Sequence, residues 1–282
     1  MAQNFTINAQ HLLEKTSGGH YDVDNTSYIA HKNEDLFKKG FPDSLIIHYT
    51  AGRSGESSAR YLAKDDVKAS AHLVVDQSGK VFQVVPFNKK SWHAGDSIYN
   101  GRRYYNHFSI GIELDNAGKL TPSGADFVSW FGKRYTADQT VKATHRNEDT
   151  PRHWHVYTEA QIAVCEEISA LLVAHYEMKE ILGHEEISPG RKSDPGPAFP
   201  LDKLRSDIFS KDRAVEESGL PDKGVVTASK LNIRALPQGG AEKVAKPIPK
   251  GKEVSVLEER DGWYRVSAQV EGWVSKKFID TK

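Results

Sequence analysis

The stretch from Phe209 to Gly224 divides this chain into two parts with different hydrophobic patterns. It is rich in charge, poor in large apolar side chains and contains Gly and Pro, as is typical of a boundary that few contacts cross. A chain of 282 residues also suits one sizeable domain and one small one, because most domains contain roughly 100–150 residues. We predict an N-terminal extension at residues 1–20 and a first domain over 21–210. A linker over 211–223 then leads to a second domain over 224–282.

Before the boundary, short apolar runs alternate with one long helical pattern. The runs that we predict to be strands are Leu45 to His48, His72 to Val75, Val81 to Val85 and Ile110 to Leu114. From Glu159 to Tyr176 the apolar residues have helical spacing, and Thr158 with Gln161 forms a capping box at its start. Cys165 lies near the apolar stripe of this helix, which predicts a buried filler rather than a reactive thiol. The fold class predicted for the first domain is α/β.

Two other segments of the first domain have distinct patterns. Residues 71–86 contain two β-rich runs around a turn at residues 76–79, which predicts a hairpin. Residues 129–157 are polar, aromatic and rich in His without a clean period, so we predict a long loop of the kind that often lines a site. A second metal site is not expected there, because two of its histidines would need a strand that the pattern does not indicate. The histidines of this segment are His145, His153 and His155.

The second part of the chain contains short strand-like runs at regular spacing. Two of them begin at Gly262-Trp263 and Gly272-Trp273. Such a pattern over about sixty residues predicts a small all-β barrel. The strings LNIR and GWYRV, followed by GWV, resemble the bacterial Src-homology-3-like domain. That resemblance implies a module that holds peptidoglycan or packs beside a catalytic partner, and it leaves open whether the two Trp side chains lie in the core.

Composition narrows the classes of partner and of metal site. Lys plus Arg and Asp plus Glu number 38 each, so no net charge favours nucleic acid. No stretch approaches the ~20 apolar residues of a membrane span, and the first residues lack the apolar run of a secretory signal. We therefore expect a cytoplasmic monomer, although export by another route or a removed signal would allow action at the cell envelope. The single cysteine, Cys165, rules out an intrachain disulfide and a Cys-rich metal cluster.

Histidine and carboxylate side chains are the remaining plausible metal ligands. His48 ends an apolar strand run, His184 follows the run ILG, and Asp194 lies in a loop stiffened by three prolines. Two His and one carboxylate leave one tetrahedral position open, as in a catalytic zinc site. Taken alone, three such residues are a weak indication, because the chain contains 12 His.

Four sequence strings around these residues make the indication specific. In order along the chain they are SLIIHYTAG, SAHLVVDQSGKVFQVVPFNKKSWHAG, HFSIGIELDNAG and GHEEISPGRKSDPGPAF. Their order and spacing, from about Asp43 to Phe199, resemble the zinc-dependent type 2 N-acetylmuramoyl-L-alanine amidases, a family related to the peptidoglycan recognition proteins. The strings WHAG and GRKSDPGPAF are most similar to the AmpD-type anhydromuramyl amidases. The resemblance implies a mixed central β-sheet flanked by helices and cleavage of the amide bond between N-acetylmuramic acid, or its 1,6-anhydro form, and L-alanine.

Matching the family's motifs assigns roles to five residues. His48, His184 and Asp194 match the zinc ligands. Glu113 matches the catalytic acid or base, and Lys192 matches the basic group near the scissile carbonyl, where it would stabilise the oxyanion.

Alternation along one predicted strand agrees with the role of Glu113. Ile110, Ile112 and Leu114 share one parity and should face the core together. Glu113 then lies on the other face, where a cleft could be. His72, on a neighbouring run, is expected to support the zinc region rather than to bind the metal.

Substrate contacts follow less directly from the resemblance. In the resembling enzymes the Trp of WHAG and nearby basic residues hold the sugar and the stem-peptide carboxylates, which makes Trp92, His93 and Lys68 candidates here. For Trp92, packing in the core is an alternative. Tyr104 occupies a position that is often basic, and Arg102 lies close to it. The preferred stem peptide stays open, because Lys68 stands where we expect Arg, and Lys cannot grip a carboxylate with two parallel hydrogen bonds.

Two other functions are alternatives to that of an active amidase. A module that binds peptidoglycan without cleaving it is the main alternative, but such family members typically lack a zinc ligand, and none is missing here. A zinc peptidase acting on ordinary peptides is disfavoured because the sequence has no HExxH motif. The substrate could be soluble muropeptides or intact peptidoglycan, and the second domain favours the polymer because a tether raises effective concentration.

Overall fold

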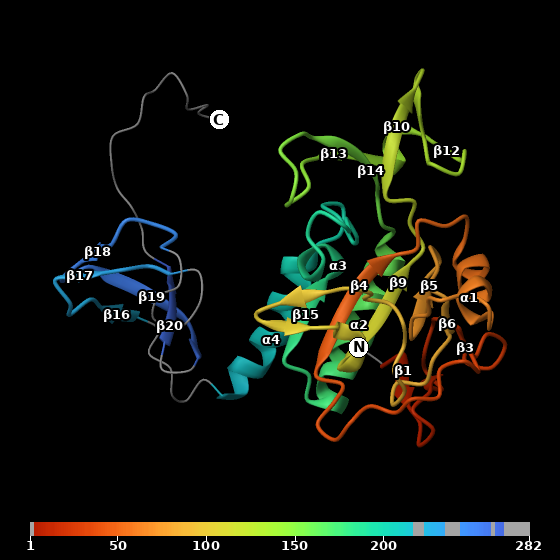
Figure 1. Ribbon diagram of the computed structural model, residues 1–282, viewed down its shortest axis with the longest axis horizontal. Coiled ribbons are helices and arrows are strands. Elements are labelled where there is room, and N and C mark those ends of the chain that lie inside the picture. Colours follow the sequence, from red (N-terminus) through yellow and green to blue (C-terminus); the bar gives the residue numbers. More distant parts are fainter. Residues whose placement is uncertain (1–2, 217–222, 235–242, 261–262, 268–282) are drawn as a thin grey trace. The chain divides into compact units, whose positions relative to one another are not determined.

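The computed structural model describes residues 3–216, 223–234, 243–260 and 263–267 (Figure 1). The chain divides into two compact units, Met1–Ser210 and Lys211–Lys282. None of the helices in the described residues has the length and apolar content that crossing a bilayer requires.

A six-stranded mixed sheet forms the centre of the first unit (Figure 1). In order across the sheet, its strands are β15 (Glu180–Gly183), β4 (Ser44–Tyr49), β9 (Ser109–Leu114), β5 (Leu73–Val75), β6 (Val81–Gln83) and β3 (Val23–Asp24). The first four run parallel, β6 returns antiparallel to β5, and β3 pairs parallel with β6. The four runs predicted as strands are β4, β5, β6 and β9, so the predicted α/β class is confirmed.

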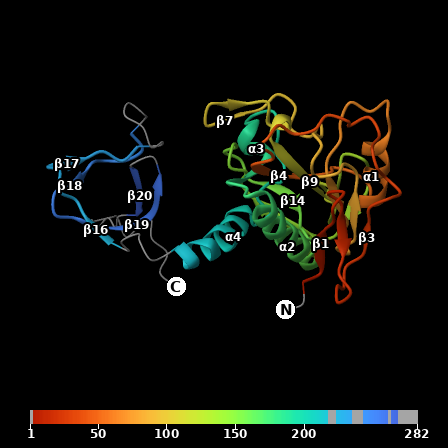
Figure 2. The same ribbon diagram turned by 90° about the horizontal axis from the view of Figure 1, so that it is seen from below.

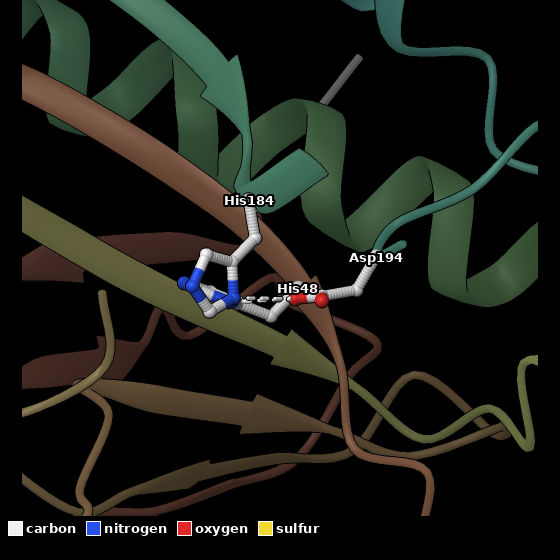
Figure 3. Close-up of side chains that lie close together, drawn as sticks. All are labelled: His48, His184 and Asp194. Carbon is white, nitrogen blue, oxygen red and sulfur yellow. Dashed lines mark hydrogen bonds and ion pairs between the residues drawn. The ribbon is translucent and has the colours of Figure 1, made fainter. Parts of the chain in front are cut away.

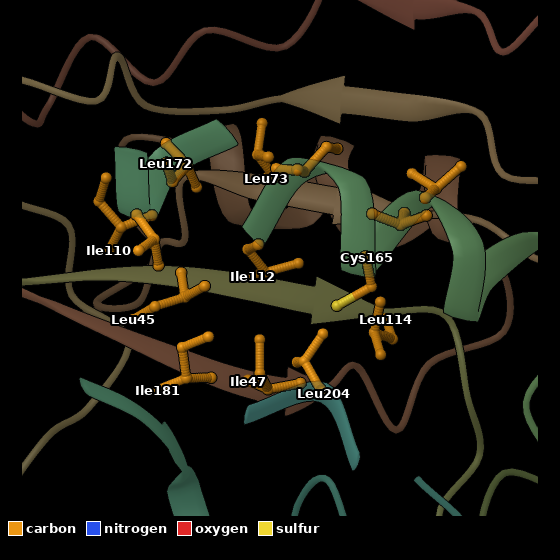
Figure 4. Close-up of a cluster of buried hydrophobic side chains, with 14 of the residues drawn as sticks. Leu45, Ile47, Leu73, Ile110, Ile112, Leu114, Cys165, Leu172, Ile181 and Leu204 are labelled. Carbon is orange, nitrogen blue, oxygen red and sulfur yellow. The ribbon is translucent and has the colours of Figure 1, made fainter. Parts of the chain in front are cut away.

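One face of this sheet packs against two helices, α2 (Glu159–Tyr176) and α4 (Leu201–Glu216) (Figure 2). Figure 4 shows Leu45 and Ile47 of β4 and Ile112 of β9 among the side chains of this core. A fully buried Leu or Ile side chain contributes roughly 1.5–3 kcal/mol to stability. This face therefore supplies most of the apolar burial that holds the sheet rigid.

The opposite face of the sheet carries His48 and Glu113 together with two smaller apolar clusters. α1 (Gly55–Ala63) covers it at β5 and β6, and α3 (His184–Ile187) covers it at β15. Near the carboxyl ends of β4 and β9, His48 and Glu113 are direct neighbours in the strand register. Because Ile112 beside Glu113 lies in the core of the other face, the predicted alternation is confirmed.

The start of α2 is as predicted. The Thr158 hydroxyl accepts a hydrogen bond from the Gln161 N–H (3.1 Å), and the Gln161 side chain accepts one from the Thr158 N–H (3.2 Å). These bonds satisfy two N–H groups near the helix start that have no partner within the helix. Cys165 is fully buried and burial raises its pKa to about 12, so the thiol is a core filler as predicted.

β5 and β6 form the predicted hairpin. Oδ1 of Asp76 accepts hydrogen bonds from the N–H groups of Ser78 (2.8 Å) and Lys80 (3.0 Å). Gly79 has a φ of 87°, which lies in the left-handed region that favours glycine. The turn chemistry therefore fixes the register of the two strands.

Residues 129–157, predicted as a loop, contribute strands to a second, antiparallel sheet. Its strands, in order, are β12 (Arg134–Tyr135), β11 (Asp126–Val128), β10 (Lys119–Ser123), β14 (Arg152–His155) and β13 (Thr140–Ala143). In Figure 1 this sheet lies beyond the edge at which β4 ends. The pattern missed it because strands of two to five residues are too short to show a clear period.

The described segments differ from the predicted domain bounds in two places. Residues 1–20, predicted as an extension, contain the paired strands β1 (Phe5–Ile7) and β2 (Leu13–Lys15), and the first residue of each is fully buried in the main core. α4 continues to Glu216 and occupies part of the predicted linker 211–223. Both differences arise from pairing or helix continuation that short, charged segments do not reveal.

Asp115, directly after β9, is a buried carboxylate that makes stability depend on pH. The Gly55 N–H at the start of α1 donates to it, but burial raises its pKa from 3.8 to about 6. A carboxyl group with a raised pKa favours folding when protonated, so this contribution is present at low pH and is lost as the pH rises through about 6. We expect Asp115→Asn, which stays neutral and keeps an acceptor for Gly55, to raise the unfolding free energy near neutral pH by roughly 1–3 kcal/mol.

Denaturant unfolding of wild type and Asp115→Asn near pH 7.5 and near pH 4 measures this effect. The difference between the two proteins should shrink at the lower pH. Asp66→Asn, a change at an exposed carboxylate, should have little effect at either pH. An equal effect of Asp115→Asn at both pH values would contradict the prediction.

After the last residues of α4, the described part of the second unit contains only strands and loops. A three-stranded antiparallel sheet is formed by β16 (Lys223–Val225), β19 (Glu253–Arg260) and β20 (Trp263–Ser267), and a separate pair by β17 (Lys230–Leu231) and β18 (Ile248–Pro249). The small core of this unit includes Val226, Ile248 and Val254. Trp263 is 37% exposed, and Trp273 lies outside the described residues.

Candidate functional site

Three buried side chains meet at the carboxyl ends of β4 and β15 (Figure 3). His48 is near the end of β4, His184 is the first residue of α3, and Asp194 lies in the loop after α3. The Nδ1 atoms of the two histidines are 2.9 Å apart, and each lies 2.8–2.9 Å from Oδ2 of Asp194. Because β4 and β15 are parallel neighbours, their ends bring residues 48 and 184 together.

The contact between the two imidazoles indicates what this arrangement can hold. Two imidazole nitrogens at this distance need a proton or a cation between them, because their lone pairs repel each other. In the described part of the chain, His48, His184 and Asp194 are the group whose donor atoms lie close enough to share an ion, all within 4.8 Å. Two imidazole nitrogens and one carboxylate oxygen are the donor set of a zinc site with an open position. The residues present therefore fit a metal ion.

Burial and hydrogen bonding set the charge of these groups. Burial and the neighbouring His184 lower the pKa of His48 to about 4. Burial opposes ionisation of Asp194, yet its close side-chain contacts with His184 and His48 hold the pKa of that carboxyl well below its usual range. Metal binding requires a neutral imidazole and an ionised carboxylate. At neutral pH, His48 and Asp194 are therefore in the forms that bind a metal.

The outward nitrogens of both histidines contact one short segment. Nε2 of His48 lies 2.9 Å from Nδ1 of His93, and Nε2 of His184 lies 3.0 Å from the carbonyl oxygen of Ala94. Contacts of this kind fix the ring orientation and the tautomer of metal-binding histidines.

The loop that carries Asp194 is held by Glu185. The Glu185 N–H donates to the Asp194 carbonyl (2.8 Å), and the Glu185 carboxylate accepts from the Gly196 N–H (3.0 Å). The same carboxylate contacts His145 (2.6 Å), in the connection between β13 and β14. His145 therefore links the second sheet to the Asp194 loop, whereas none of the three histidines of residues 129–157 belongs to the candidate metal group of the described chain.

Glu113 lies beside the metal-binding group on the adjacent strand. It pairs with His48 in the register of β4 and β9, so both side chains leave the same face of the sheet. Its Oε2 atom is buried and has no hydrogen-bond partner among the described residues. Burial, and secondarily the charge of Asp194, raise the pKa of Glu113 to about 8. A carboxyl group in this state can both accept and return a proton near neutral pH.

Lys192 brings a positive charge to the same place. It is half-buried and lies two residues before Asp194. Its charge opposes the rise in the pKa of Glu113 and adds to the fall in the pKa of His48. The ammonium group therefore acts electrostatically on both Glu113 and His48.

Two stretches of the chain match known families. Residues 38–197, more than half of the chain, match the N-acetylmuramoyl-L-alanine amidase family. The chain belongs to this family. The match includes the three metal-binding candidates, Glu113 and Lys192. Residues 229–280 match the bacterial SH3 domain, which confirms the resemblance of the second unit.

Individual amidases show the extent of the similarity. Over 142 residues the chain is 32% identical to the 1,6-anhydro-N-acetylmuramyl-L-alanine amidase AmpD of Salmonella typhimurium, which is 50% of this chain and 57% of that protein. Over 194 residues it is 31% identical to AmpD of Citrobacter freundii, 66% of this chain and 85% of that protein. A solved complex of the amidase AmiD from E. coli with anhydro-N-acetylmuramic acid-L-Ala-D-gamma-Glu-L-Lys aligns with a TM-score of 0.44 and 24% identity, over 81% of this chain and 77% of that one. The chain thus spans little more than half the length of the Salmonella relative.

Three predicted substrate contacts of this amidase domain lie at its surface. Trp92 is 41% exposed, and the Lys32 ammonium lies 5.7 Å from its ring centre. Lys32 also donates to three carbonyl groups of residues 64–69, the loop that carries the exposed Lys68. Tyr104 is about half exposed. The core alternative for Trp92 does not fit this exposure, and contact of these three side chains with substrate stays a prediction.

Arg102 has contacts that do not fit the predicted substrate role. Its guanidinium contacts Asp43 (2.9 Å) and Glu180 (3.3 Å). These carboxylates stand at the starts of β4 and β15, whereas the metal-binding candidates stand at the ends of the same strands. Arg102 therefore joins two strand starts far from the metal group, a role that neighbours in sequence do not reveal.

His93 is also placed differently from its predicted role. It is buried, and both of its ring nitrogens contact protein groups, His48 on one side and Ser109 on the other. His72, expected to support the zinc region, lies 6.0 Å from His93 between ring centres and contacts the Lys89 carbonyl (2.9 Å).

Sequence reasoning missed Asn106, which holds the segment next to both histidines. Its Oδ1 accepts hydrogen bonds from the N–H groups of His93 (3.0 Å) and Ala94 (2.7 Å). Asn106 forms hydrogen bonds with backbone groups, so its residue type does not indicate this role in the sequence. The only available sign was its place directly before the string HFSIGIEL, close to WHAG in the family pattern.

Proposed function

We propose that this chain hydrolyses the amide bond between N-acetylmuramic acid, or its 1,6-anhydro form, and L-alanine in peptidoglycan or muropeptides. The observation that best supports this is the convergence of two imidazole nitrogens and one carboxylate oxygen beside the buried Oε2 atom of Glu113, which has no hydrogen-bond partner among the described residues. The match to the amidase family and the names of the similar AmpD proteins agree with the same bond.

We propose zinc as the metal, with His48, His184 and Asp194 as its ligands. Bound zinc supplies a polarised scissile carbonyl and a water molecule that is acidic enough to attack near neutral pH. The chain's own contribution is to hold three donor atoms on the ends of two paired strands and a braced loop, so that little reorganisation is needed when the metal binds.

Glu113 and Lys192 would handle the proton and the negative charge. Glu113 takes the proton from the attacking water and delivers it to the nitrogen of L-alanine as the carbon–nitrogen bond breaks. The same residue therefore accepts the proton and returns it. Its Oε2 atom, which has no hydrogen-bond partner within the described part of the chain, is available for this task. Lys192 stabilises the negative charge that develops on the carbonyl oxygen.

A module that binds peptidoglycan without cleaving it is the alternative function. Such a module has no need of a buried Glu113 oxygen that lacks a partner among the residues the structure describes, because that arrangement costs free energy in the folded state. Incubating the zinc-loaded protein with a soluble anhydromuramyl-peptide and identifying the products by mass tests the two functions. Release of the free sugar and of a peptide that begins with L-alanine supports the amidase. Tight binding without release would favour the recognition module.

Removing the second unit should separate the cleavage reaction from attachment to the polymer. Every residue proposed for the chemistry precedes Pro195, and the amidase family match ends at residue 197. We expect a protein that ends after Glu216, and so keeps all of α4, to cleave soluble muropeptides at nearly the full-length rate. On intact peptidoglycan the same truncation should lower the rate and the cosedimenting fraction by about tenfold or more, because a tether raises effective concentration.

The melting temperature of the truncated protein is the control for this comparison. An unchanged melting temperature with loss only on the polymer indicates a tether. Equal loss on both substrates would contradict the prediction and would make the second unit part of the enzyme.

A further inference from the structure

A chain of hydrogen bonds runs from His48 to the backbone of β9. Nε2 of His48 lies 2.9 Å from Nδ1 of His93, and Nε2 of His93 lies 3.2 Å from the Ser109 carbonyl oxygen. The Ser109 hydroxyl oxygen is also 3.2 Å from Nε2 of His93, and its own hydrogen is donated to the Tyr105 carbonyl. Both oxygens of Ser109 are therefore acceptors for His93, so Nε2 of His93 carries a proton.

This proton on His93 determines the tautomer of His48. His93 is 9% exposed and lies against the rings of His48 and His72, where a second proton and its charge would be costly. A neutral His93 with its proton on Nε2 presents a lone pair at Nδ1, which accepts the Nε2–H of His48. Nδ1 of His48 then has no proton, and this atom faces His184 and Asp194. The contact thus directs a lone pair to the point where the three donors meet.

Ala94, the residue after His93, contacts His184, the second histidine of the metal-binding group. The Ala94 carbonyl accepts from Nε2 of His184, which leaves Nδ1 of that ring free of a proton as well. We propose that His93 is a positioning residue for His48, and that His93 and Ala94, held together by Asn106, orient both histidines of the metal site. The proposal rests on the proposed function in one respect, that His48 and His184 are metal ligands.

Gly111 leaves the space that the His93 ring occupies. A Cβ atom on Gly111 would lie 2.5 Å from Cγ and 2.7 Å from Nδ1 of His93, closer than real atoms approach. Gly111 is on β9, and a side chain at this position would lie on the same face of the strand as that of Glu113, two residues further on. Any side chain at position 111 would therefore push the ring away from His48.

The affinity for zinc, measured by competition with a chelating dye, tests the role of His93. We expect His93→Leu, which fills the volume but cannot accept a hydrogen bond, to bind zinc roughly 10- to 100-fold more weakly than wild type. In His93→Asn the amide oxygen can take the place of Nδ1 and accept from His48, so this variant should recover much of the affinity. A role in packing alone predicts the opposite order, because Asn fills the space less well than Leu. The melting temperature of each metal-free protein shows whether the fold is intact.

Gly111→Ala gives an independent test of the same contact. It should weaken zinc binding in the wild-type background and add little in a His93→Ala background, because the ring that it displaces is then absent. Wild-type affinity in His93→Leu, or equal losses in His93→Leu and His93→Asn, would overturn the positioning role. A wild-type protein that retains no zinc would instead overturn the proposed function, so the two failures are distinguishable.

Discussion

Replacing His184 by Ala is expected to abolish both zinc retention and turnover. The change removes one of three donor atoms that lie within 4.8 Å of one another, and two remaining donors are too few for a protein zinc site. Elemental analysis after dialysis should find about one zinc per chain in the wild type and almost none in the variant. Turnover of a soluble muropeptide should fall by about a thousandfold or more, because the polarised carbonyl and the activated water are both lost.

A strong chelator should have the same effect on the wild type, and added zinc should restore activity. His31→Ala is a matched control, since His31 is exposed and lies outside the metal-binding group. It should keep its zinc and its turnover. Undiminished activity after verified removal of the metal would exclude the proposed chemistry.

Glu113→Gln is expected to separate catalysis from metal binding. Glutamine has the shape of glutamate but cannot take a proton, so turnover should fall roughly 10²- to 10⁴-fold. Zinc content should be unchanged, because Glu113 is not among the three donors. The loss should lie in kcat, with a smaller change in KM, since proton transfer is needed only as the bond breaks.

Glu177→Gln is the control for this substitution, because Glu177 is exposed at the end of α2. It should behave as wild type. Normal turnover of Glu113→Gln would mean that another group acts as the base. Loss of zinc from that variant would mean that Glu113 belongs to the metal site itself.

The sequence was informative where the deciding contacts are local. The capping box of Thr158 and Gln161 acts within four residues, so it predicted the start of α2 without knowledge of the fold. Alternation over six residues of β9 was enough to place Glu113 on the face opposite Ile112. The motif strings likewise named the three metal-binding candidates that the structure brings together.

The sequence was less informative about side chains whose partners are distant. In the sequence, Arg102 is a basic residue near a motif. In the structure its position depends on contacts with Asp43 and Glu180, which lie 59 and 78 residues away along the chain. The short strands of residues 129–157 depend on pairing with one another rather than on a local period. Burial of β1 depends on packing against the core of the main sheet, whose residues lie later in the sequence.

For the candidate site, the sequence by itself determined which chemical groups are present and on which strand face or loop each one lies. Only the tertiary structure decided which ring nitrogens face each other, because His48 and His184 are 136 residues apart and their orientation depends on Nε2 contacts with a third segment. The same folding buried His93 behind His48 instead of leaving it for substrate. Local periodicity and capping are encoded within a few residues, whereas a tautomer and a ring direction are set by hydrogen bonds that exist only after distant segments have packed.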